Sequence, residues 1–500
     1  MSEIAARLTH LCSVAEDRLS PDRAAELRQL AGRLKGPLRI AIAGRVKAGK
    51  STLLNALVGE RLAPTDAGEC TRIVTWYRRD DSYGVRARYV DGTMADLPFE
   101  RAEGTLHIDL GDGDPATIEH IDVRWPSANL DRITLIDTPG LASLDDQNSA
   151  RTVEFLASGD GEGPTDADAV VYLMRHIHRQ DVEFLDAFMD RTVAQASPAN
   201  AIGVLSRADE IGGGRLDALD SARRIAKRYR EDESVKTLCS TVIPVAGLLA
   251  EGGATLRQDE YRDLALIAAE DDPTLNALLI TSDRFRMAGI GPLTSEKRTH
   301  LLGRFGLFGV RFAVDQIRSG AAADAPAMAR SMVHASGVGE LRRLLVDHFL
   351  PRARVLQGRA VLVALRALAG ELDVGDARWL SGEIEQIEST TGELAELRLL
   401  HLAIAGAAGF SDAETEEVRA LLLPGEPAVR LGLHGAEPDA LRNAVIAAVE
   451  RWRLRSSDPR NDPIEVEACE LVAQTYERLY VLVDARESSD ATHHPARNEA

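Results

Sequence analysis

Apolar residues recur at two different spacings along this chain, and the spacing changes near residue 250. Before that point, short apolar runs alternate with helical stretches, which is typical of buried strands in a mainly parallel sheet with helices on both faces. The predicted strands are 38–43, 73–77, 121–125, 133–136, 169–174, 202–205 and 242–245. Beyond residue 250 the apolar positions follow a helical period, so the remainder is predicted to be almost wholly helical.

Both ends of the chain carry predicted helices with a single apolar face. They lie within 2–35, 338–349, 352–371, 438–454 and 463–484. Pairing the two ends in one bundle beneath the sheet would bury both sets of apolar faces. The alternatives are that they cover the sheet or form a separate domain. The predicted division is 1–36 as N-terminal bundle helices, 37–350 as an α/β domain with a helical extension at 250–335, 351–484 as a C-terminal helical bundle, and 485–500 as a disordered tail.

Composition and charge narrow the function classes. The 500 residues are 45% apolar with a net charge of −19, which predicts a folded, soluble chain that nucleic acid repels. The four cysteines lie far apart, so reduced thiols in a cytoplasmic protein are expected. The charged N-terminus is unlike a signal peptide, and the absence of a long apolar run predicts no membrane span.

Residues 44–51 match the phosphate-binding pattern GxxxxGK[ST] in full. A predicted strand precedes the match and a predicted helix follows it, which is the context that the motif requires. Backbone N–H groups of such a loop surround phosphates, and the helix N-terminus adds a positive dipole end. Lys50 is expected to reach the β- and γ-phosphates, and Ser51 to bind Mg²⁺. The predicted nucleotide contacts are Gly44, Arg45, Val46, Lys47, Ala48, Gly49, Lys50, Ser51 and Thr52.

A second motif, Asp-Thr-Pro-Gly, begins at Asp137, directly after the predicted strand 133–136. A carboxylate at a strand end beside a phosphate loop can hold Mg²⁺ through water. The amide of Gly140, at the end of the motif, can sense the γ-phosphate. The pattern therefore predicts that Asp137 serves the metal and that Gly140 serves the nucleotide.

A threonine from a mobile loop is also expected to reach Mg²⁺ and the γ-phosphate. Thr71 lies just before the predicted strand 73–77 and is preferred, because the loop must return immediately before that strand begins. Thr65 is the competing candidate. The predicted metal ligands are Ser51, Thr71 and Asp137.

The loop after the predicted strand 202–205 indicates which base is bound. Asp209 can accept two hydrogen bonds from guanine N1–H and N2–H₂, a pair of donors that adenine lacks, so GTP is preferred over ATP. The usual Asn/Thr-Lys that precedes such an aspartate is replaced here by Ser206 and Arg207, whose stem can lie over the base. The backbone N–H of Ala246, after the last predicted strand, is the candidate for guanine O6.

With these motifs in view, the chain resembles the bacterial dynamin-like GTPases, and among them the mycobacterial isoniazid-inducible group, in particular its smaller C member. The resemblance rests on segments that cover most of the chain, at 44–57, 63–76, 125–140, 204–215, 244–250 and 304–311. It implies a GTPase domain with a helical bundle built from both chain ends, and GTP, GDP and Mg²⁺ as cofactors. It also implies GTP-dependent pairing of the GTPase heads and peripheral contact with a membrane, which for a cytoplasmic protein is the inner face of the plasma membrane.

The catalytic residues expected from these motifs are Lys50, Lys47, Thr71 and Gly140. Small GTPases often place a water-orienting glutamine where this chain has Leu141. Dynamins also lack that glutamine, and they need paired heads to arrange the water. Eukaryotic dynamins also use a Gln-Ser pair at the positions of Val46 and Lys47. One hypothesis is that Lys47 supplies positive charge between the β- and γ-phosphates. The alternative is a solvated surface lysine.

Two further questions stay open at this level. Residues 304–312 are the most aromatic stretch of the chain, and an ordinary core helix is favoured there over a lipid-inserting or head-contacting segment. The function is predicted to be either a self-assembling GTPase that reshapes membranes or a nucleotide-dependent regulatory subunit that binds a second dynamin-like GTPase. An ATPase is disfavoured by Asp209.

Overall fold

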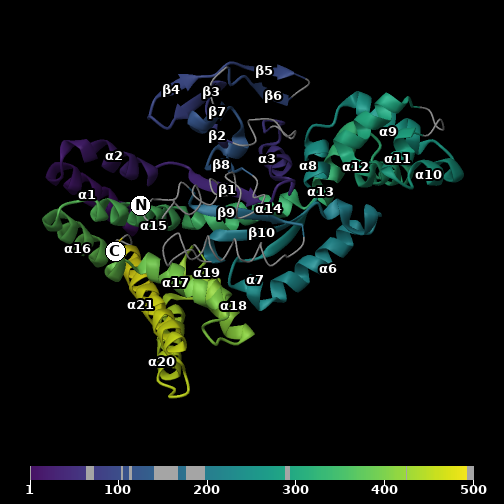
Figure 1. The fold of residues 1–500 in the computed structure, drawn as a ribbon. Coiled ribbons are helices and arrows are strands. Elements are labelled where there is room, and N and C mark those ends of the chain that lie inside the picture. Colours follow the sequence, from purple (N-terminus) through teal and green to yellow (C-terminus); the bar gives the residue numbers. More distant parts are fainter. Residues whose placement is uncertain are drawn as a thin grey trace, which may run out of the picture.

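The computed structural model describes residues 2–63, 73–102, 105–111, 115–139, 167–175, 198–287, 293–423 and 425–492. Within them, the strands of the central sheet are β1 (Leu38–Gly44), β2 (Val74–Arg79), β3 (Gly84–Tyr89), β4 (Met94–Asp96), β7 (Ile118–Trp125), β8 (Ile133–Asp137), β9 (Ala169–Met174), β10 (Ala201–Ser206) and β11 (Val242–Val245). They form one nine-stranded sheet in the order β11-β10-β9-β1-β8-β2-β7-β3-β4 (Figure 1).

The sheet is mainly parallel. β1 runs parallel to β8 on one side and to β9 on the other, and β10 and β11 continue the parallel run to one edge. β2 is antiparallel to β8, while β3 and β4 add antiparallel pairs at the opposite edge. Nearly every residue of β1 is buried, as expected for a strand with neighbours on both sides and cover on both faces. The predicted α/β fold with a mainly parallel sheet is confirmed.

Residues 84–108 contain strands that the apolar pattern did not predict. They are β3, β4 and a separate hairpin of β5 (Phe99–Ala102) and β6 (Thr105–Ile108). In β3, Arg86 and Arg88 alternate with the buried Val85 and Ala87, and each arginine forms an ion pair. A strand with one charged face shows no continuous apolar run, which is why it was missed.

Helices cover the sheet, and a further group of helices extends the α/β domain on one side. Those around the sheet are α3 (Lys50–Val58), α6 (Ala218–Glu231), α8 (Gly247–Ala254) and α14 (Val338–Leu344). The extension, to the right in Figure 1, comprises α9 (Gln258–Ala268), α10 (Asp272–Leu278), α11 (Ser282–Met287), α12 (Ser295–Arg318) and α13 (Ala325–Ala335). The aromatic stretch lies in α12, where Phe305 and Phe308 are 0% and 2% exposed. The core-helix interpretation of this stretch is therefore confirmed.

Helices from both ends of the chain share one hydrophobic core. α1 (Glu3–Arg18) and α2 (Ala24–Arg33) pack with α15 (Ala353–Gly370) and α16 (Val374–Thr390). A Cβ on Gly358 would lie 2.7 Å from Cδ1 of Ile4, so glycine permits the close crossing of α1 and α15. At the end of α2, the buried guanidinium of Arg33 donates to the buried Asp168 at 2.8 Å, just before β9. The predicted bundle from both ends is present, and its domain boundaries stay a prediction.

The remaining C-terminal helices include α17 (Gly392–Ile404), α18 (Asp412–Leu421), α20 (Pro438–Ser456) and α21 (Pro463–Thr492). α20 and α21 lie side by side as a hairpin that projects at the lower edge of Figure 1. The sequence prediction ended the last helix at 484 and made 485–500 a disordered tail, but α21 continues to Thr492. Ala485, Arg486 and Glu487 are good helix formers, which explains the extension. Among the described residues, no helix combines the length and apolar character needed to cross a membrane.

Candidate functional site

The phosphate-binding motif forms a tight loop between β1 and α3. Gly44 has a φ of 147°, and a Cβ there would lie 2.5 Å from the carbonyl oxygen of Leu173 in β9, so only glycine fits. Gly49, the residue before α3, is left-handed at a φ of 94°. Lys47 is also left-handed, with a φ of 63°. A non-glycine residue in this conformation costs about 1–3 kcal/mol and is concentrated at functional sites.

Lys50 begins α3 and is buried behind this loop. Its Nζ donates a hydrogen bond to the carbonyl oxygen of Gly44 at 3.2 Å. Burial lowers the pKa of Lys50, and the carboxylate of Asp137 opposes that shift. An ammonium group held out of water with one carbonyl partner binds a phosphate anion favourably, because the anion supplies the missing countercharge.

Ser51 and Asp137 meet beside the loop, although they are far apart in sequence. The Ser51 hydroxyl donates to Oδ2 of Asp137 at 2.9 Å, while Oδ1 of Asp137 is buried and has no hydrogen-bond partner among the described residues. Burial raises the pKa of Asp137, and the nearby Lys50 charge lowers it. The next residue, Thr138, is fixed by a 3.0 Å hydrogen bond from its hydroxyl to the carbonyl oxygen of Ile42.

A hydroxyl and a carboxylate are oxygen ligands of the kind that Mg²⁺ prefers, and the orphaned carboxylate oxygen fits a cation at this position. Two of the three predicted metal ligands are thus brought together. The third, Thr71, lies outside the described residues, as do its competitor Thr65, the predicted γ-phosphate sensor Gly140, and Leu141.

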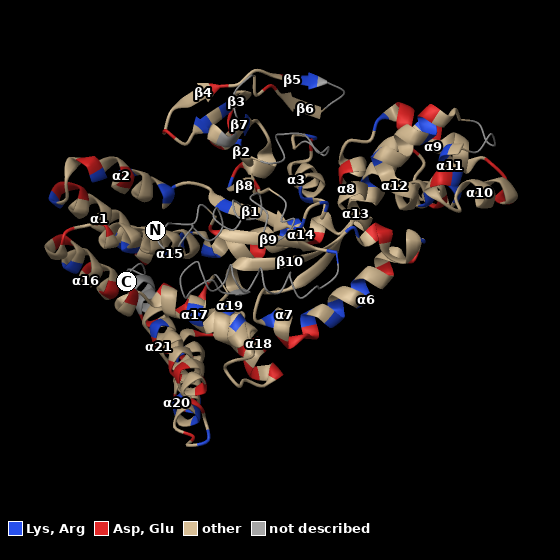
Figure 2. Cartoon of the chain, in the orientation of Figure 1, with Lys and Arg blue, Asp and Glu red and all other residues tan. Residues whose placement is uncertain are grey.

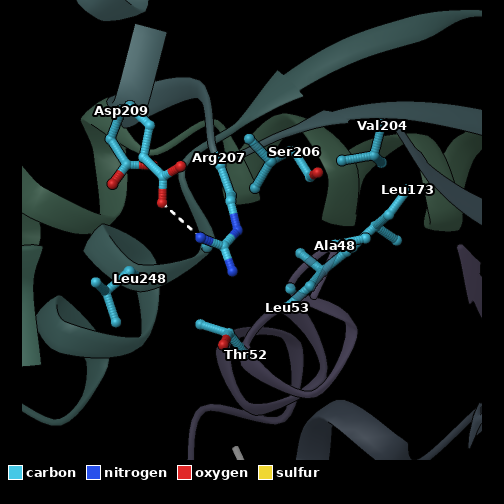
Figure 3. A pocket seen from close by; sticks show the side chains of 13 residues that line it. Ala48, Thr52, Leu53, Leu173, Val204, Ser206, Arg207, Asp209 and Leu248 are labelled. Carbon is cyan, nitrogen blue, oxygen red and sulfur yellow. Dashed lines mark hydrogen bonds and ion pairs between the residues drawn. The ribbon is translucent and has the colours of Figure 1, made fainter. Parts of the chain in front are cut away.

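A pocket of about 140 Å³ opens at the carboxyl ends of β9, β10 and β11, next to the phosphate loop. Figure 3 shows Ser206, Arg207 and Asp209 on one side of it and Ala48, Thr52 and Leu53 on the other. Ligands of open parallel sheets bind at this end of the strands. The sequence reasoning missed the apolar wall, which is formed by Leu173, Val204 and Leu248. Leu173 and Val204 lie near the carboxyl ends of the predicted strands 169–174 and 202–205, and that position could have indicated that they line the site.

Asp209 is the buried carboxylate of this pocket, with an exposed fraction of 5%. Its Oδ1 has no hydrogen-bond partner among the described residues. Burial raises the pKa of Asp209 to about 6, with a smaller contribution from the charge of Glu210. A buried carboxylate with an unpaired oxygen is complementary to a ligand that brings N–H groups.

Arg207 extends across the pocket in Figure 3 from a left-handed backbone with a φ of 51°. Its Nη1 donates to Oε1 of Glu210 at 2.7 Å, and Arg175 pairs with the other oxygen of Glu210 at 2.6 Å. Glu210 was not predicted from the sequence. The Ser206 hydroxyl donates to the carbonyl oxygen of Met174 at 3.2 Å, which fixes the end of β10 at the pocket wall.

The prediction for Ala246 is wrong. Its N–H donates to the carbonyl oxygen of Ser336 at 2.8 Å, and its side chain is fully buried, so this amide is already occupied. A contact between β11 and the residues before α14 cannot be foreseen from a local motif. Gly247 and Leu248, at the start of α8, line the pocket instead. The first backbone N–H groups of a helix have no intrahelical acceptor and can bind a carbonyl oxygen.

The other predicted contact residues of the phosphate loop differ in their exposure to solvent. Val46 is 48% exposed, and Lys47 is exposed with no ion pair among the described residues. Arg45 and Thr52 are half-buried, and Thr52 lines the pocket beside the loop. One edge of the mainly parallel sheet therefore carries the phosphate-binding loop, the Asp137 carboxylate and the pocket that contains Asp209. This arrangement defines a P-loop nucleotide-binding domain.

The comparisons with known proteins place this domain in a family. Residues 40–195 match the model of the dynamin family. The chain is 37% identical to isoniazid-induced protein IniC of Mycobacterium tuberculosis, over 92% of this chain and 93% of that protein. It is 30% identical to a bacterial dynamin-like protein of Nostoc punctiforme, over 23% of this chain and 18% of that protein. The chain belongs to the dynamin family, as the sequence predicted.

Among solved structures, a chain from an oligomerised bacterial dynamin pair matches at 14% identity with a TM-score of 0.32. The match covers 97% of this chain and 92% of that chain.

Proposed function

We propose that this protein binds GTP and GDP and hydrolyses GTP with Mg²⁺. The observation that carries the proposal is the buried carboxylate of Asp209, which lies in the pocket beside the phosphate loop with one oxygen unpaired among the described residues. Guanine N1–H and N2–H₂ supply the donors that this carboxylate lacks, whereas adenine does not. Arg207, held by Glu210, covers the base.

The remaining roles follow from the surroundings of each residue. The backbone N–H groups from Gly44 to Thr52 and the ammonium of Lys50 bind the phosphates. Ser51, Asp137 and Thr71 hold Mg²⁺, which, when bound, neutralises charge on the β- and γ-phosphates. Gly140 senses the γ-phosphate, and the first N–H groups of α8, which have no acceptor within the helix, replace Ala246 as partners of guanine O6.

Hydrolysis also needs a group that assists the reaction, and Leu141 cannot orient the attacking water because its side chain is apolar. Lys47 is the candidate for added positive charge, since its side chain is exposed at the rim of the loop and has no ion pair among the described residues. Its left-handed backbone indicates that the loop holds this residue in a fixed position at some cost. Charge placed between the β- and γ-phosphates stabilises the transition state of phosphoryl transfer.

Membership of the dynamin family supports pairing of the heads, with a second copy or with another dynamin-like GTPase, and contact with a membrane. Figure 2 shows both signs of charge interspersed along the α20–α21 hairpin. Arg453 pairs with Glu477 at 2.6 Å there, so opposite charges offset one another along the hairpin. Leu454, the residue after Arg453, is 77% exposed. Membrane contact through the hairpin would therefore depend on apolar residues more than on charge.

A regulatory subunit that binds a second dynamin-like GTPase and turns over slowly is the alternative. Val46 and Leu141, together with the short helical region after the head, are the features that favour it. This alternative retains the same nucleotide site, and the two candidates differ in the rate at which the isolated chain hydrolyses GTP.

The proposal is tested by competition of unlabelled nucleotides against a fluorescent GDP bound to the full chain. GDP and GTP should displace the probe at least about tenfold more effectively than ADP and ATP, an order of magnitude expected for a site built around two hydrogen bonds to a carboxylate. Lys50→Ala should abolish probe binding. Equal displacement by guanine and adenine nucleotides would refute the guanine site, and sedimentation with a non-hydrolysable GTP analogue would show whether the heads pair.

A further inference from the structure

Helix α12 is interrupted where it passes the base pocket. Gly306 has non-helical angles, with φ at 65° and ψ at 174°, and it divides the helix into two parts. A Cβ on Gly306 would lie 3.4 Å from Cδ2 of Leu248 and 3.9 Å from Oδ2 of Asp209. The second half of α12 therefore begins directly beside the carboxylate that is proposed to recognise guanine.

The turn that follows Asp209 has little rigidity of its own. Gly212, Gly213 and Gly214 have successive φ values of 64°, 75° and 68°. Glycine reaches this conformation freely but also leaves it freely, because no side chain restricts the backbone. Within the turn, Gly214 N–H bonds to the carbonyl oxygen of Ile211 at a long 3.3 Å. A contact from outside the turn would therefore restrain the segment that begins with Asp209.

Arg311, in the second half of α12, provides that restraint. Its Nη1 donates to the carbonyl oxygens of Gly213, at 3.1 Å, and of Gly214. Its Nε and Nη2 donate to the carbonyl oxygen of Leu279, and Nη2 also donates to that of Ile280, at 2.9 Å. All of these partners are backbone carbonyls, so one planar guanidinium joins the Asp209 turn to the connection between α10 and α11.

We propose that Arg311 is a positioning residue for guanine specificity: it fixes the three-glycine turn and so keeps the Asp209 carboxylate aimed into the base pocket. The inference rests on the proposed function. The shape of the guanidinium matters more than its charge, because Nη1 donates to the turn while Nε and Nη2 donate to the connection between α10 and α11. The single nitrogen of an ammonium cannot bond to both sides at once. The helical extension thereby takes part in nucleotide recognition rather than serving only as a cover.

The test compares GDP with inosine diphosphate, which lacks the exocyclic amino group and so loses one of the two donors to Asp209. Dissociation constants are measured for the full chain, for Arg311→Ala and for Arg311→Lys. Arg318→Ala is the matched control, since Arg318 lies on the same helix and its 43% exposed side chain pairs with Asp272 at 2.7 Å. Thermal unfolding of each variant reports whether it folds.

The wild type should prefer GDP by about tenfold or more, the value expected for a hydrogen bond to a charged acceptor. The preference should fall below about threefold in Arg311→Ala and in Arg311→Lys, and should persist in Arg318→Ala. A purely structural role would weaken GDP and inosine diphosphate equally, so an unchanged ratio in both Arg311 variants would overturn this inference alone. A wild type without any preference would overturn the guanine site itself. If Arg311→Ala fails to fold, Arg311→Lys decides.

Discussion

Replacing Asp209 with asparagine removes a negative charge that folding buries at an exposed fraction of 5%. The carboxylate has an unpaired Oδ1 among the described residues, and its pKa is raised from 3.8 to about 6, mainly by burial. At about 1.4 kcal/mol per pKa unit, this shift corresponds to about 3 kcal/mol of unfolding free energy. The nucleotide-free protein is therefore less stable at neutral pH than it would be with a neutral side chain.

The sign follows from the direction of the shift. The folded state holds the Asp209 proton more tightly than the unfolded chain, so the associated stability is complete below pH 3.8 and is lost as the pH rises through about 6. An asparagine side chain has no such proton. Asp209→Asn should thus stabilise the nucleotide-free chain at pH 7.5 by up to about 3 kcal/mol, less about 1–3 kcal/mol for any amide group left unpaired. Below about pH 4 the advantage should disappear.

The assay is urea unfolding of the nucleotide-free chain at several pH values between about 4 and 7.5, with GDP affinity measured in parallel. Asp217→Asn is the control, because Asp217 lies in the same connection with a side chain 58% exposed, and its effect should stay within about 0.5 kcal/mol. GDP binding should weaken sharply in Asp209→Asn despite the higher stability. A stability difference that does not change with pH would refute the assignment of this buried charge.

Three other substitutions test separate parts of the account. Lys47→Ala should lower kcat of the assembled protein about tenfold or more while sparing GDP affinity, since its charge stabilises the transition state. Single-turnover hydrolysis measures the effect, and an unchanged kcat would exclude this role for Lys47. Asp168→Ala removes the buried carboxylate that pairs with Arg33, so urea unfolding should show a loss of about 3–5 kcal/mol, and a loss below about 1 kcal/mol would contradict it. Gly44→Ala should abolish GDP binding, because its Cβ would lie 2.5 Å from the carbonyl oxygen of Leu173; calorimetry measures this, and retained binding would contradict the loop geometry.

The fold could be predicted largely because its strands are short apolar runs and its nucleotide motifs are local. The predicted strands 169–174 and 242–245 agree with β9 and β11 at both ends. Lys50, Ser51 and Asp137 come together as predicted, since each lies next to a strand or helix end whose position the motif fixes. Parallel strands meet at one edge, which is sufficient to assemble such a site from sequence.

The features that escaped prediction depend on contacts between distant segments. Whether the Ala246 amide is free depends on Ser336, which no spacing rule connects to it. The role of Arg311 depends on carbonyl groups of two other loops, and backbone acceptors leave no mark in the sequence. Gly306 lies in the stretch 304–312 that was predicted to be an ordinary core helix, since a single glycine only weakens a helix. Its non-helical backbone angles, next to Leu248 and Asp209, could not be read from that local pattern.

The central claim is that this chain hydrolyses GTP through a dynamin-type head. The most direct measurement is phosphate release from GTP across a range of protein concentrations, with ATP and with Lys50→Ala as controls. We expect turnover per molecule that rises with protein concentration, depends on Mg²⁺, is absent with ATP and vanishes in Lys50→Ala. Turnover of ATP at a similar rate, or activity that survives Lys50→Ala, would contradict it. Tight GTP binding with slow turnover at every concentration would contradict the proposal that the chain is a self-assembling GTPase, and would favour the regulatory subunit.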